Sequence, residues 1–172
     1  MPRKNVSTQL SLIKNRLDKA GVRWAVFAGA AAHCYGSKIE VTDVDILVAN
    51  ADLDKAKAAL KGVDLEGFDV AVGSDIHTPQ GVCCFFLDDE AVKRVQQKQL
   101  FGVSVPVISV EDNIVFKAIL QRGKEEGKHD VEHIRDMVKH EKIDLEYLRD
   151  RIQQCHANKR VMPLLRTLIP NF

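Results

Sequence analysis

Two aspartates with one residue between them stand at the start of an apolar run. Asp43 and Asp45 flank a valine, and the apolar residues 46–48 that follow are typical of a buried strand. Side chains at positions i and i+2 of a strand project from the same face, about 7 Å apart. Two carboxylates placed in this way can share a divalent cation, and burying them without a cation or hydrogen bonds costs several kcal/mol. We therefore predict a metal site at Asp43 and Asp45.

A glycine follows the preceding apolar run. Residues 24–28 are continuously apolar and are expected to form a short strand, with Gly29 directly after them. Glycine permits a tight turn and a close approach of a ligand to the backbone. Residues 30–35 can begin a helix whose free N–H groups attract phosphate. An ordinary strand-to-helix turn would also explain this glycine, but its spacing from Asp43 and Asp45 favours a ligand site.

Together these two segments resemble the signature of the nucleotidyltransferase superfamily, which includes DNA polymerase beta and small stand-alone microbial nucleotidyltransferases. In that signature an apolar residue, Gly, and then Gly or Ser are followed, after a spacer, by Asp-x-Asp or Asp-x-Glu within an apolar strand. Here twelve residues separate Ala30 from Asp43. Ala30 stands where the family usually has Gly or Ser, and Lys38 is the basic residue near the position where many relatives carry Arg. The resemblance implies that Gly29, Ala30 and Lys38 bind a nucleotide.

The resemblance also implies a reaction. In this superfamily the paired acids bind two magnesium ions, which hold a nucleoside triphosphate and activate an acceptor hydroxyl for in-line attack with release of pyrophosphate. Asp43 and Asp45 would then be catalytic as well as metal-binding. A third carboxylate normally comes from a neighbouring strand, and Asp69 in the run 68–72 fits that pattern. Relatives with a similar C-terminal part often carry this acid on a later strand, here the acid-free run 82–87, so either Asp69 serves or the third ligand is absent.

The C-terminal half carries a second part of the resemblance. Small nucleotidyltransferases often show Glu-Asp-Leu after a strand, a Lys on the next helix, and a Lys/Arg-x-Asp segment that opens another helix. This chain has related residues in 109–112, at Lys117 and Arg122, and in 128–130. The resemblance therefore covers residues 20–140. Lys117 could reach the triphosphate, and a solvated helix lysine is the alternative interpretation.

Three histidines have positions that could serve a ligand. His33 follows the glycine turn, where it could touch a phosphate or be an ordinary helix residue. His129 and His133 have the i, i+4 spacing of helical metal ligands. Since no third ligand lies in register with them, we expect these two to form an exposed polar face.

The apolar periodicity predicts the elements that must position these residues. Strands are expected over 24–28, 43–48, 68–72, 82–87 and 103–108, with a loop over 73–81. Helices are expected over 7–20 and 51–61, from 88, from 109, over 130–139, from 144 and around 161–168. Ser7 and Asn50 are expected to cap the first two helices, and Ser109 and Asp144 two of the C-terminal ones. The apolar residues of the first helix are expected to form one buried face: Leu10, Ile13, Leu17 and Ala20. The apolar run 82–87 suggests a central strand, and Pro106 suggests that 103–108 lies at a sheet edge.

This order predicts an α+β fold, with a small mixed β-sheet, helices packed on it and a C-terminal helical extension. The resemblance implies that the sheet and its helices have the nucleotidyltransferase fold. We expect residues 1–108 to form the nucleotidyltransferase-like core and residues 109–172 to form the helical extension, packed on the core as one structural unit.

Composition limits the classes of partner and location. The chain has 172 residues, 45% of them hydrophobic, and a formal net charge of +1, which gives no strong signal for nucleic acid. No apolar run approaches the ~18 residues of a membrane span, and the N-terminus lacks the apolar core of a signal peptide. The four cysteines, Cys34, Cys83, Cys84 and Cys155, contain no C-x-x-C pair. Reduced thiols in a cytoplasmic protein are therefore expected.

Two functional hypotheses follow from these residues. The first is a magnesium-dependent nucleotidyltransferase that transfers a nucleotidyl group from a nucleoside triphosphate, such as ATP, to a hydroxyl of a small molecule or a protein. The alternative is a catalytically inactive nucleotide-binding or protein-interaction module that keeps the fold. The sequence specifies neither the acceptor nor the preferred base nor the oligomeric state.

Overall fold

Five strands form a mixed sheet and two more form a separate hairpin in the computed structural model, which describes residues 5–172. The strands are β1 (Trp24–Phe27), β2 (Val44–Val48), β3 (Phe68–Val72), β4 (Ser74–Thr78), β5 (Gly81–Phe85), β6 (Gln96–Leu100) and β7 (Val103–Val107). The helices are α1 (Val6–Lys19), α2 (Ala28–Cys34), α3 (Leu53–Ala59), α4 (Asp89–Lys93), α5 (Val110–Leu120), α6 (Asp130–His140), α7 (Leu145–Gln154) and α8 (Asn158–Leu168). Two short 3-10 turns are η1 (Asn50–Asp52) and η2 (Lys124–Glu126). The α+β class predicted from the sequence is confirmed.

The topology of the five-stranded sheet brings the two candidate segments together. Its strand order is β3-β2-β1-β7-β6. β1 is antiparallel to β2 and parallel to β7, β2 and β3 are parallel, and β6 and β7 are antiparallel. Because β1 and β2 are antiparallel, the end of β1 lies beside the start of β2. The glycine turn after β1 is therefore adjacent to the aspartates that open β2.

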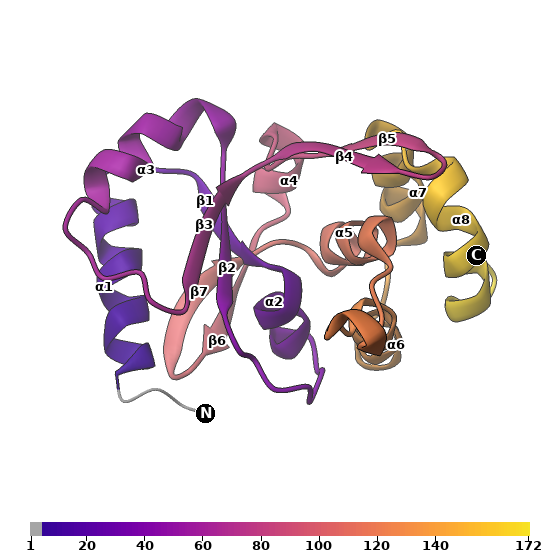
Figure 1. Ribbon diagram of the computed structural model, residues 1–172, viewed down its shortest axis with the longest axis horizontal. Coiled ribbons are helices and arrows are strands. Elements are labelled where there is room, and N and C mark those ends of the chain that lie inside the picture. Colours follow the sequence, from indigo (N-terminus) through magenta and orange to yellow (C-terminus); the bar gives the residue numbers. More distant parts are fainter. Residues whose placement is uncertain (1–4) are drawn as a thin grey trace.

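Helices cover both faces of this sheet (Figure 1). One face is covered by α1 and α3, and α2 lies on the other face with the C-terminal helices beyond it. The hairpin of β4 and β5 extends from β3 over to α7 and α8. The apolar stripe of α1 is buried as predicted, with Leu10, Ile13 and Leu17 fully inaccessible to solvent. The side that faces α2 and α5 is the one on which the candidate site lies.

The capping residues predicted from the sequence are confirmed in the C-terminal half of the chain and were wrong in the N-terminal half. The side chains of Ser109 and Asp144 accept hydrogen bonds that cap α5 and α7, as predicted. Ser7 instead lies inside α1, which begins after Asn5. Asn50 does not cap α3 with its side chain, because that amide accepts from the N–H of Gly73 and donates to its carbonyl.

The segment 73–87 differs most from its prediction. Residues 74–78, expected in a loop, form β4, and β4 pairs with β5 outside the five-stranded sheet. The expected central strand 82–87 is thus one strand of an outer hairpin, in which Val82 is 48% exposed. The N–H of Cys84 donates to the carbonyl of Cys155, at the end of α7. The apolar character of this strand reflects packing against C-terminal helices, which periodicity alone does not distinguish from burial within a sheet.

The far end of the sheet also differs from its prediction. β6 was not expected, because its mostly polar side chains are exposed, as is common for a strand at a sheet edge. β7 lies between β1 and β6 and not at the edge. Its pairing with β1 is limited to Val26 and Val107, so Pro106, which has no N–H to donate, interrupts no ladder there.

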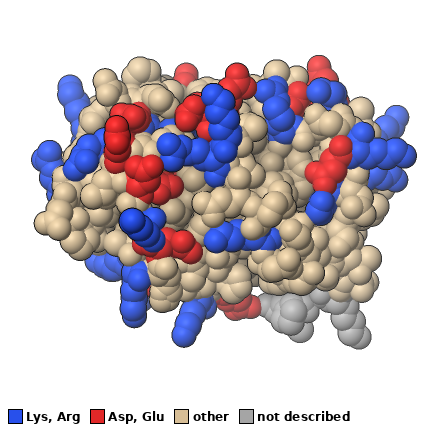
Figure 2. Space-filling view, turned by 180° about the vertical axis from the view of Figure 1, so that it is seen from behind, with Lys and Arg blue, Asp and Glu red and all other residues tan. Residues whose placement is uncertain are grey.

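On the face shown in Figure 2, Lys and Arg side chains are interspersed with Asp and Glu, without a field of one sign. Among residues 5–172, no helix combines the length and the apolar character needed to cross a membrane. The four cysteines are unpaired; Cys83 and Cys155 are buried, whereas Cys34 and Cys84 are partly exposed.

Candidate functional site

The register of two parallel strands places Asp45 beside Asp69. β2 and β3 pair Asp45 with Asp69, so both side chains leave the same face of the sheet from neighbouring strands. Adjacent strands are about 4.8 Å apart, closer than the ~7 Å between alternate residues of one strand. Asp43, just before β2, is exposed; Asp45 is half-buried and Asp69 is exposed. The three predicted acids therefore lie at the start of two neighbouring strands.

The environment of Asp45 opposes its ionisation. Burial raises the pKa of Asp45 to about 6, and the neighbouring charges of Asp69 and Asp43 act in the same direction, against Lys117 and Lys128. Within the described part of the chain, neither the Asp45 nor the Asp69 carboxylate has a hydrogen bond or an ion pair. Two carboxylates on adjacent strands repel each other, and a cation shared between them would relieve that repulsion. The geometry thus leaves two adjacent acids with their oxygens available to a cation.

A buried ionic network lies next to these acids. The ammonium of Lys117 on α5 is 2.8 Å from the carboxylate of Asp130 on α6, and both side chains are almost fully buried. The guanidinium of Arg122 contacts the same carboxylate at 2.9 Å. Although burial acts to raise it, the hydrogen bonds from Arg122 and the charge of Lys117 hold the pKa of Asp130 below its usual value. Lys117, predicted to bind the nucleotide, is therefore held by Asp130 and is not a solvated helix lysine.

A cavity of about 380 Å³ opens at Asp45. Its charged lining residues are Asp45, Arg122 and Lys128. Its remaining wall is mostly apolar, from the ends of β1 and β2, from β3 to β5 and from α5: Phe27, Ala28, Leu47, Ala71, Val72, Gly73, Ser74, Ile76, Phe85, Phe116 and Leu120. One acid and two cations thus line a space large enough for a small ligand, and Asp43 and Asp69 are not among its lining residues.

The glycine turn adjoins this cavity. α2 begins at Ala28, which lines the cavity, and Gly29 follows with partial exposure. Ala30 is fully buried, with no part of the residue accessible to solvent, so its side chain packs in the interior. The turn therefore lies where the sequence predicts it, beside the end of the ladder that pairs Phe27 with Asp45.

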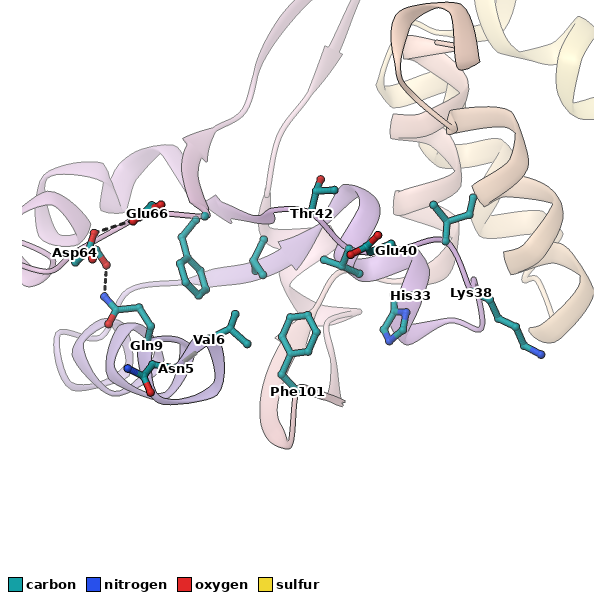
Figure 3. Close-up of a pocket in the computed structure, with 15 residues that line it drawn as sticks. Asn5, Val6, Gln9, His33, Lys38, Glu40, Thr42, Asp64, Glu66 and Phe101 are labelled. Atoms are coloured by element: carbon teal, nitrogen blue, oxygen red, sulfur yellow. Dashed lines mark hydrogen bonds between the residues drawn. The ribbon is translucent and has the colours of Figure 1, made fainter. Parts of the chain in front are cut away.

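Lys38 lies at a different cavity, on the other side of β2. This second cavity, of about 430 Å³, is lined by side chains that alternate with Asp45 and Asp69, among them Val44 and Phe68. In Figure 3 the side chain of Lys38 points away from the other labelled residues. His33 also lines this cavity. The structure thus places Lys38, predicted to bind the nucleotide, and His33 at a different cavity from the one that Asp45 lines.

The expectation of an exposed histidine face on α6 was wrong for His133. His133 is 7% exposed, and its Nδ1 has no hydrogen-bond partner in the described part of the chain. A Cβ placed on Gly29 would lie 3.7 Å from the Cε1 of His133. Burial, and then the charge of Lys117, lower the pKa of His133 to about 4. This histidine is a neutral interior residue behind the glycine turn, because α2 and α5 cover its side of α6.

The donors at Asp45 suit a hard cation of the magnesium type. Among residues 5–172, no three His, Cys, Asp or Glu side chains form a ready-made metal site. Magnesium, however, is commonly held by one or two carboxylates together with waters and substrate phosphates. The oxygen-only donor set of Asp45 and Asp69, without nitrogen or sulfur, fits that mode. His129 and His133 do not belong to such a set.

Two cavity residues have roles that the sequence interpretation missed. The charged segment 124–128 indicates a solvated turn from its balanced charges alone, yet Lys128 lines the cavity and has no ion pair within residues 5–172. Arg122 lines it while bound to Asp130. The Lys/Arg-x-Asp segment 128–130 was the available signal for both, since Asp130 holds Arg122 in place.

Comparisons with known proteins agree with this architecture. Residues 76–167 match a family described as "Nucleotidyl transferase of unknown function (DUF2204)". No curated protein sequence matches the chain. The solution structure of the antibiotic-resistance factor ANT(2'')-Ia superposes with a TM-score of 0.55 at 14% identity, over 88% of this chain and 93% of that one.

Two further solved structures give the same result. The crystal structure of ANT(2'')-Ia in complex with adenylyl-2''-tobramycin has a TM-score of 0.52 at 15% identity, over 87% of this chain and 98% of that one. A putative nucleotidyltransferase from Thermotoga maritima has a TM-score of 0.54 at 18% identity, over 90% and 96%. At these identities the likeness is one of fold, and it confirms the nucleotidyltransferase fold predicted from the sequence.

Proposed function

This chain belongs to the family of nucleotidyl transferases of unknown function, and we propose that it transfers a nucleotidyl group from a nucleoside triphosphate to an acceptor hydroxyl at the cavity beside Asp45. The observation that carries this proposal is the pairing of Asp45 with Asp69 across β2 and β3. Two adjacent carboxylates without a protein counter-ion are costly, and a cation-bound triphosphate would offset that cost.

The acids would hold magnesium together with the substrate. We assign the cation to Asp45 and Asp69, with Asp43 near enough to raise the pKa of Asp45. Bound magnesium would neutralise charge on the triphosphate and acidify the acceptor hydroxyl. Asp69, which is exposed and paired with Asp45, would accept the proton of that hydroxyl as its oxygen attacks the α-phosphorus and pyrophosphate leaves.

The cations across the cavity would orient the phosphates. Lys128 is exposed and unpaired within the described residues, so its ammonium is free to move onto a phosphate oxygen. Arg122 keeps one edge of its guanidinium on Asp130, which limits where the remaining N–H groups can point. Lys117 contributes its charge to Asp45 from behind, without leaving Asp130. The backbone of Gly29 completes the phosphate end of the site.

The test is magnesium-dependent binding of triphosphates followed by release of pyrophosphate. Each of the four ribonucleoside triphosphates is titrated by calorimetry with magnesium and with EDTA, for wild type, Lys128→Ala and Asp150→Asn. Asp150 is an exposed carboxylate on α7, away from both cavities. We expect binding that requires magnesium, at least tenfold weaker binding by Lys128→Ala, and wild-type affinity for Asp150→Asn.

Pyrophosphate release separates the two functional hypotheses. Incubation with radiolabelled triphosphate and a panel of hydroxyl-bearing small molecules and proteins should yield pyrophosphate and a labelled acceptor. Binding of triphosphate without pyrophosphate release under any of these conditions would favour the inactive nucleotide-binding module. Absence of any magnesium-dependent binding would refute the assignment of this cavity altogether.

A further inference from the structure

Ala28 has a backbone conformation that alanine rarely adopts. Its φ angle is 60°, in the left-handed region, at the junction between β1 and α2. For residues other than glycine this region is unfavourable, because the Cβ approaches the following carbonyl. Such strain persists only where the surrounding structure enforces it, and it concentrates at functional sites.

One buried side chain enforces this conformation. The Oδ1 of Asn113 accepts from the N–H of Ala28 at 2.8 Å, and the Nδ2 of Asn113 donates to the carbonyl of Ala28 at 3.1 Å. Asn113 is fully buried near the start of α5. Its amide therefore holds both polar groups of a single residue, and its remaining Nδ2 hydrogen faces the sulfur of Met137 at 3.4 Å. This arrangement is a two-point clamp on the Ala28 backbone.

The clamp acts at the edge of the candidate site. Ala28 lines the cavity, and the residue before it, Phe27, is paired with Asp45 in the β1–β2 ladder. The residue after it is Gly29. Rotating Ala28 to an ordinary negative φ at the same ψ would swing the Gly29 peptide away, because the two dihedral angles of residue 28 set the direction of the chain that follows. The clamp thus sets where the turn lies relative to Asp45.

We propose that Asn113 is a positioning residue for nucleotide binding, which holds Ala28 left-handed so that the turn through Gly29 faces the cavity beside Asp45. This inference rests on the proposed function for its ligand, the magnesium complex of a nucleoside triphosphate. Glycine at position 28 would reach the same conformation without strain. Alanine with a clamp restricts the turn to one conformation before the nucleotide arrives, which reduces the ordering that binding requires.

The experiment uses glycine to rescue the loss of the clamp. Binding of magnesium and the preferred triphosphate is measured by calorimetry for wild type, Asn113→Ala, Ala28→Gly and the double variant. We expect Asn113→Ala to bind at least tenfold more weakly. The double variant should recover most of that loss while its Tm stays below that of wild type, because glycine tolerates the left-handed angle without the clamp.

A matched variant separates positioning from a general loss of stability. Tyr35→Phe removes another buried hydrogen bond, from the Tyr35 hydroxyl to the Ile108 carbonyl at 2.7 Å, and does not touch Ala28. It should lower the Tm while keeping the dissociation constant within twofold of wild type. If Asn113→Ala prevents folding, Asn113→Leu fills a similar volume without either hydrogen bond and replaces it in each comparison.

Two results would overturn the inference, and each differs from a failure of the proposed function. Unchanged affinity in a folded Asn113→Ala or Asn113→Leu protein would make the clamp purely structural. A binding loss that Ala28→Gly does not restore would show that Asn113 acts other than through Ala28. If wild type itself binds no triphosphate, the proposed function fails and the role in nucleotide binding fails with it; hydrogen exchange of the Ala28 amide, slow in wild type and fast in Asn113→Ala, would still report the clamp.

Discussion

At the scale of single residues, the ionised carboxylate of Asp45 lowers the stability of the folded protein as long as no cation is bound. Its pKa of about 6 results first from burial and then from the charge of Asp69. An acid whose folded pKa exceeds its unfolded pKa makes the folded state less stable as the pH rises through the folded pKa. Near neutral pH the ionised carboxylate therefore weakens the protein, and a bound cation would remove that penalty.

Neutral side chains at Asp43 and Asp45 should stabilise the ligand-free protein. We expect Asp43→Asn/Asp45→Asn at pH 7.5 to melt at or above the wild-type temperature, because the raised pKa of Asp45 corresponds to a penalty on the order of 3 kcal/mol in the ionised state. The double variant should show no further rise in Tm with magnesium and triphosphate, whereas wild type should show one by mass action. Thermal melting with and without ligand checks both points.

Asp150→Asn replaces an exposed carboxylate on α7 and is the control for these melts. Its Tm should respond to ligand as that of wild type does. Two results would mean that Asp43 and Asp45 serve packing or hydrogen bonding. One is a double variant that melts well below wild type without ligand, and the other is a double variant whose Tm rises with ligand as much as that of wild type.

His133 should make the protein less stable in mild acid. Its folded pKa of about 4 lies below the ordinary value of 6.5, because burial disfavours the charged ring. The unfolded chain therefore binds a proton first, and stability present above pH 6.5 is lost as the pH falls toward 4, by about 3 kcal/mol. Urea unfolding of wild type and His133→Gln across this range should show a shallower slope in the variant.

His140→Gln provides the comparison for that slope, since His140 is an exposed histidine of the same helix. Its pH dependence should follow wild type. Equal slopes for wild type and His133→Gln would show that His133 takes up a proton in the folded protein as readily as in the unfolded chain, contrary to its burial.

At the scale of elements, one carboxylate joins α5, α6 and the loop between them. Asp130, fully buried, binds the Lys117 ammonium, the Arg122 guanidinium and the Arg122 backbone N–H. Removing one partner from a buried ion pair is far more costly than breaking an exposed pair, because a charge is left without compensation. The packing of α6 against α5, and with it the position of Arg122 at the cavity, depends on this residue.

Asp130→Asn should destabilise the fold by about 3 kcal/mol, because Lys117 would stay buried without a counter-charge. The measurement is urea unfolding at pH 7.5. Glu132→Gln removes an exposed pair with Lys124 on the same helix and should change the free energy of unfolding by less than about 0.5 kcal/mol. Similar losses in the two variants would mean that water reaches Lys117 and screens it.

At the scale of the whole molecule, Arg151 connects parts that are distant in the sequence. From α7, its Nε donates to Asp112 on α5 at 2.7 Å, and its terminal nitrogens reach Asp88 at 2.6 Å and the Phe86 carbonyl at 3.2 Å. Arg151 is 1% exposed. The contacts cross the boundary at residue 108 that the sequence suggests between a core and a helical extension. That division into residues 1–108 and 109–172 stays a proposal, as does the packing of both as one structural unit.

We therefore expect one cooperative unfolding transition. Trp24, the single tryptophan, lies in β1 and reports the sheet by fluorescence, while circular dichroism at about 222 nm reports the helices. The two signals should give the same Tm in wild type. Arg151→Met should lower both together by several degrees, because Asp112 would be buried without its partner. Two separate transitions in wild type would mean that the core and the helical extension unfold independently.

The sequence by itself determined the features that depend on neighbours along the chain. The spacing of Gly29 from Asp43 and Asp45, the apolar stripe of α1, and the caps at Ser109 and Asp144 are all local patterns, and the structure places each of them as predicted. Hydrophobic periodicity and capping act over a few residues, so these features can be recognised without knowledge of the rest of the fold.

Only the tertiary structure decided which distant residues meet. It placed Asp69 opposite Asp45, buried Lys117 and His133, moved Lys38 to the other side of β2, and turned an expected central strand into the hairpin of β4 and β5. The sequence pattern around a polar helix residue is the same whether another element covers that face or solvent does. Likewise, the apolar pattern of a strand does not indicate which strand or helix it packs against. The pairing of β2 with β3 and the packing of α6 under α2 and α5 provide that information, because burial and register are set by contacts between segments far apart in the chain.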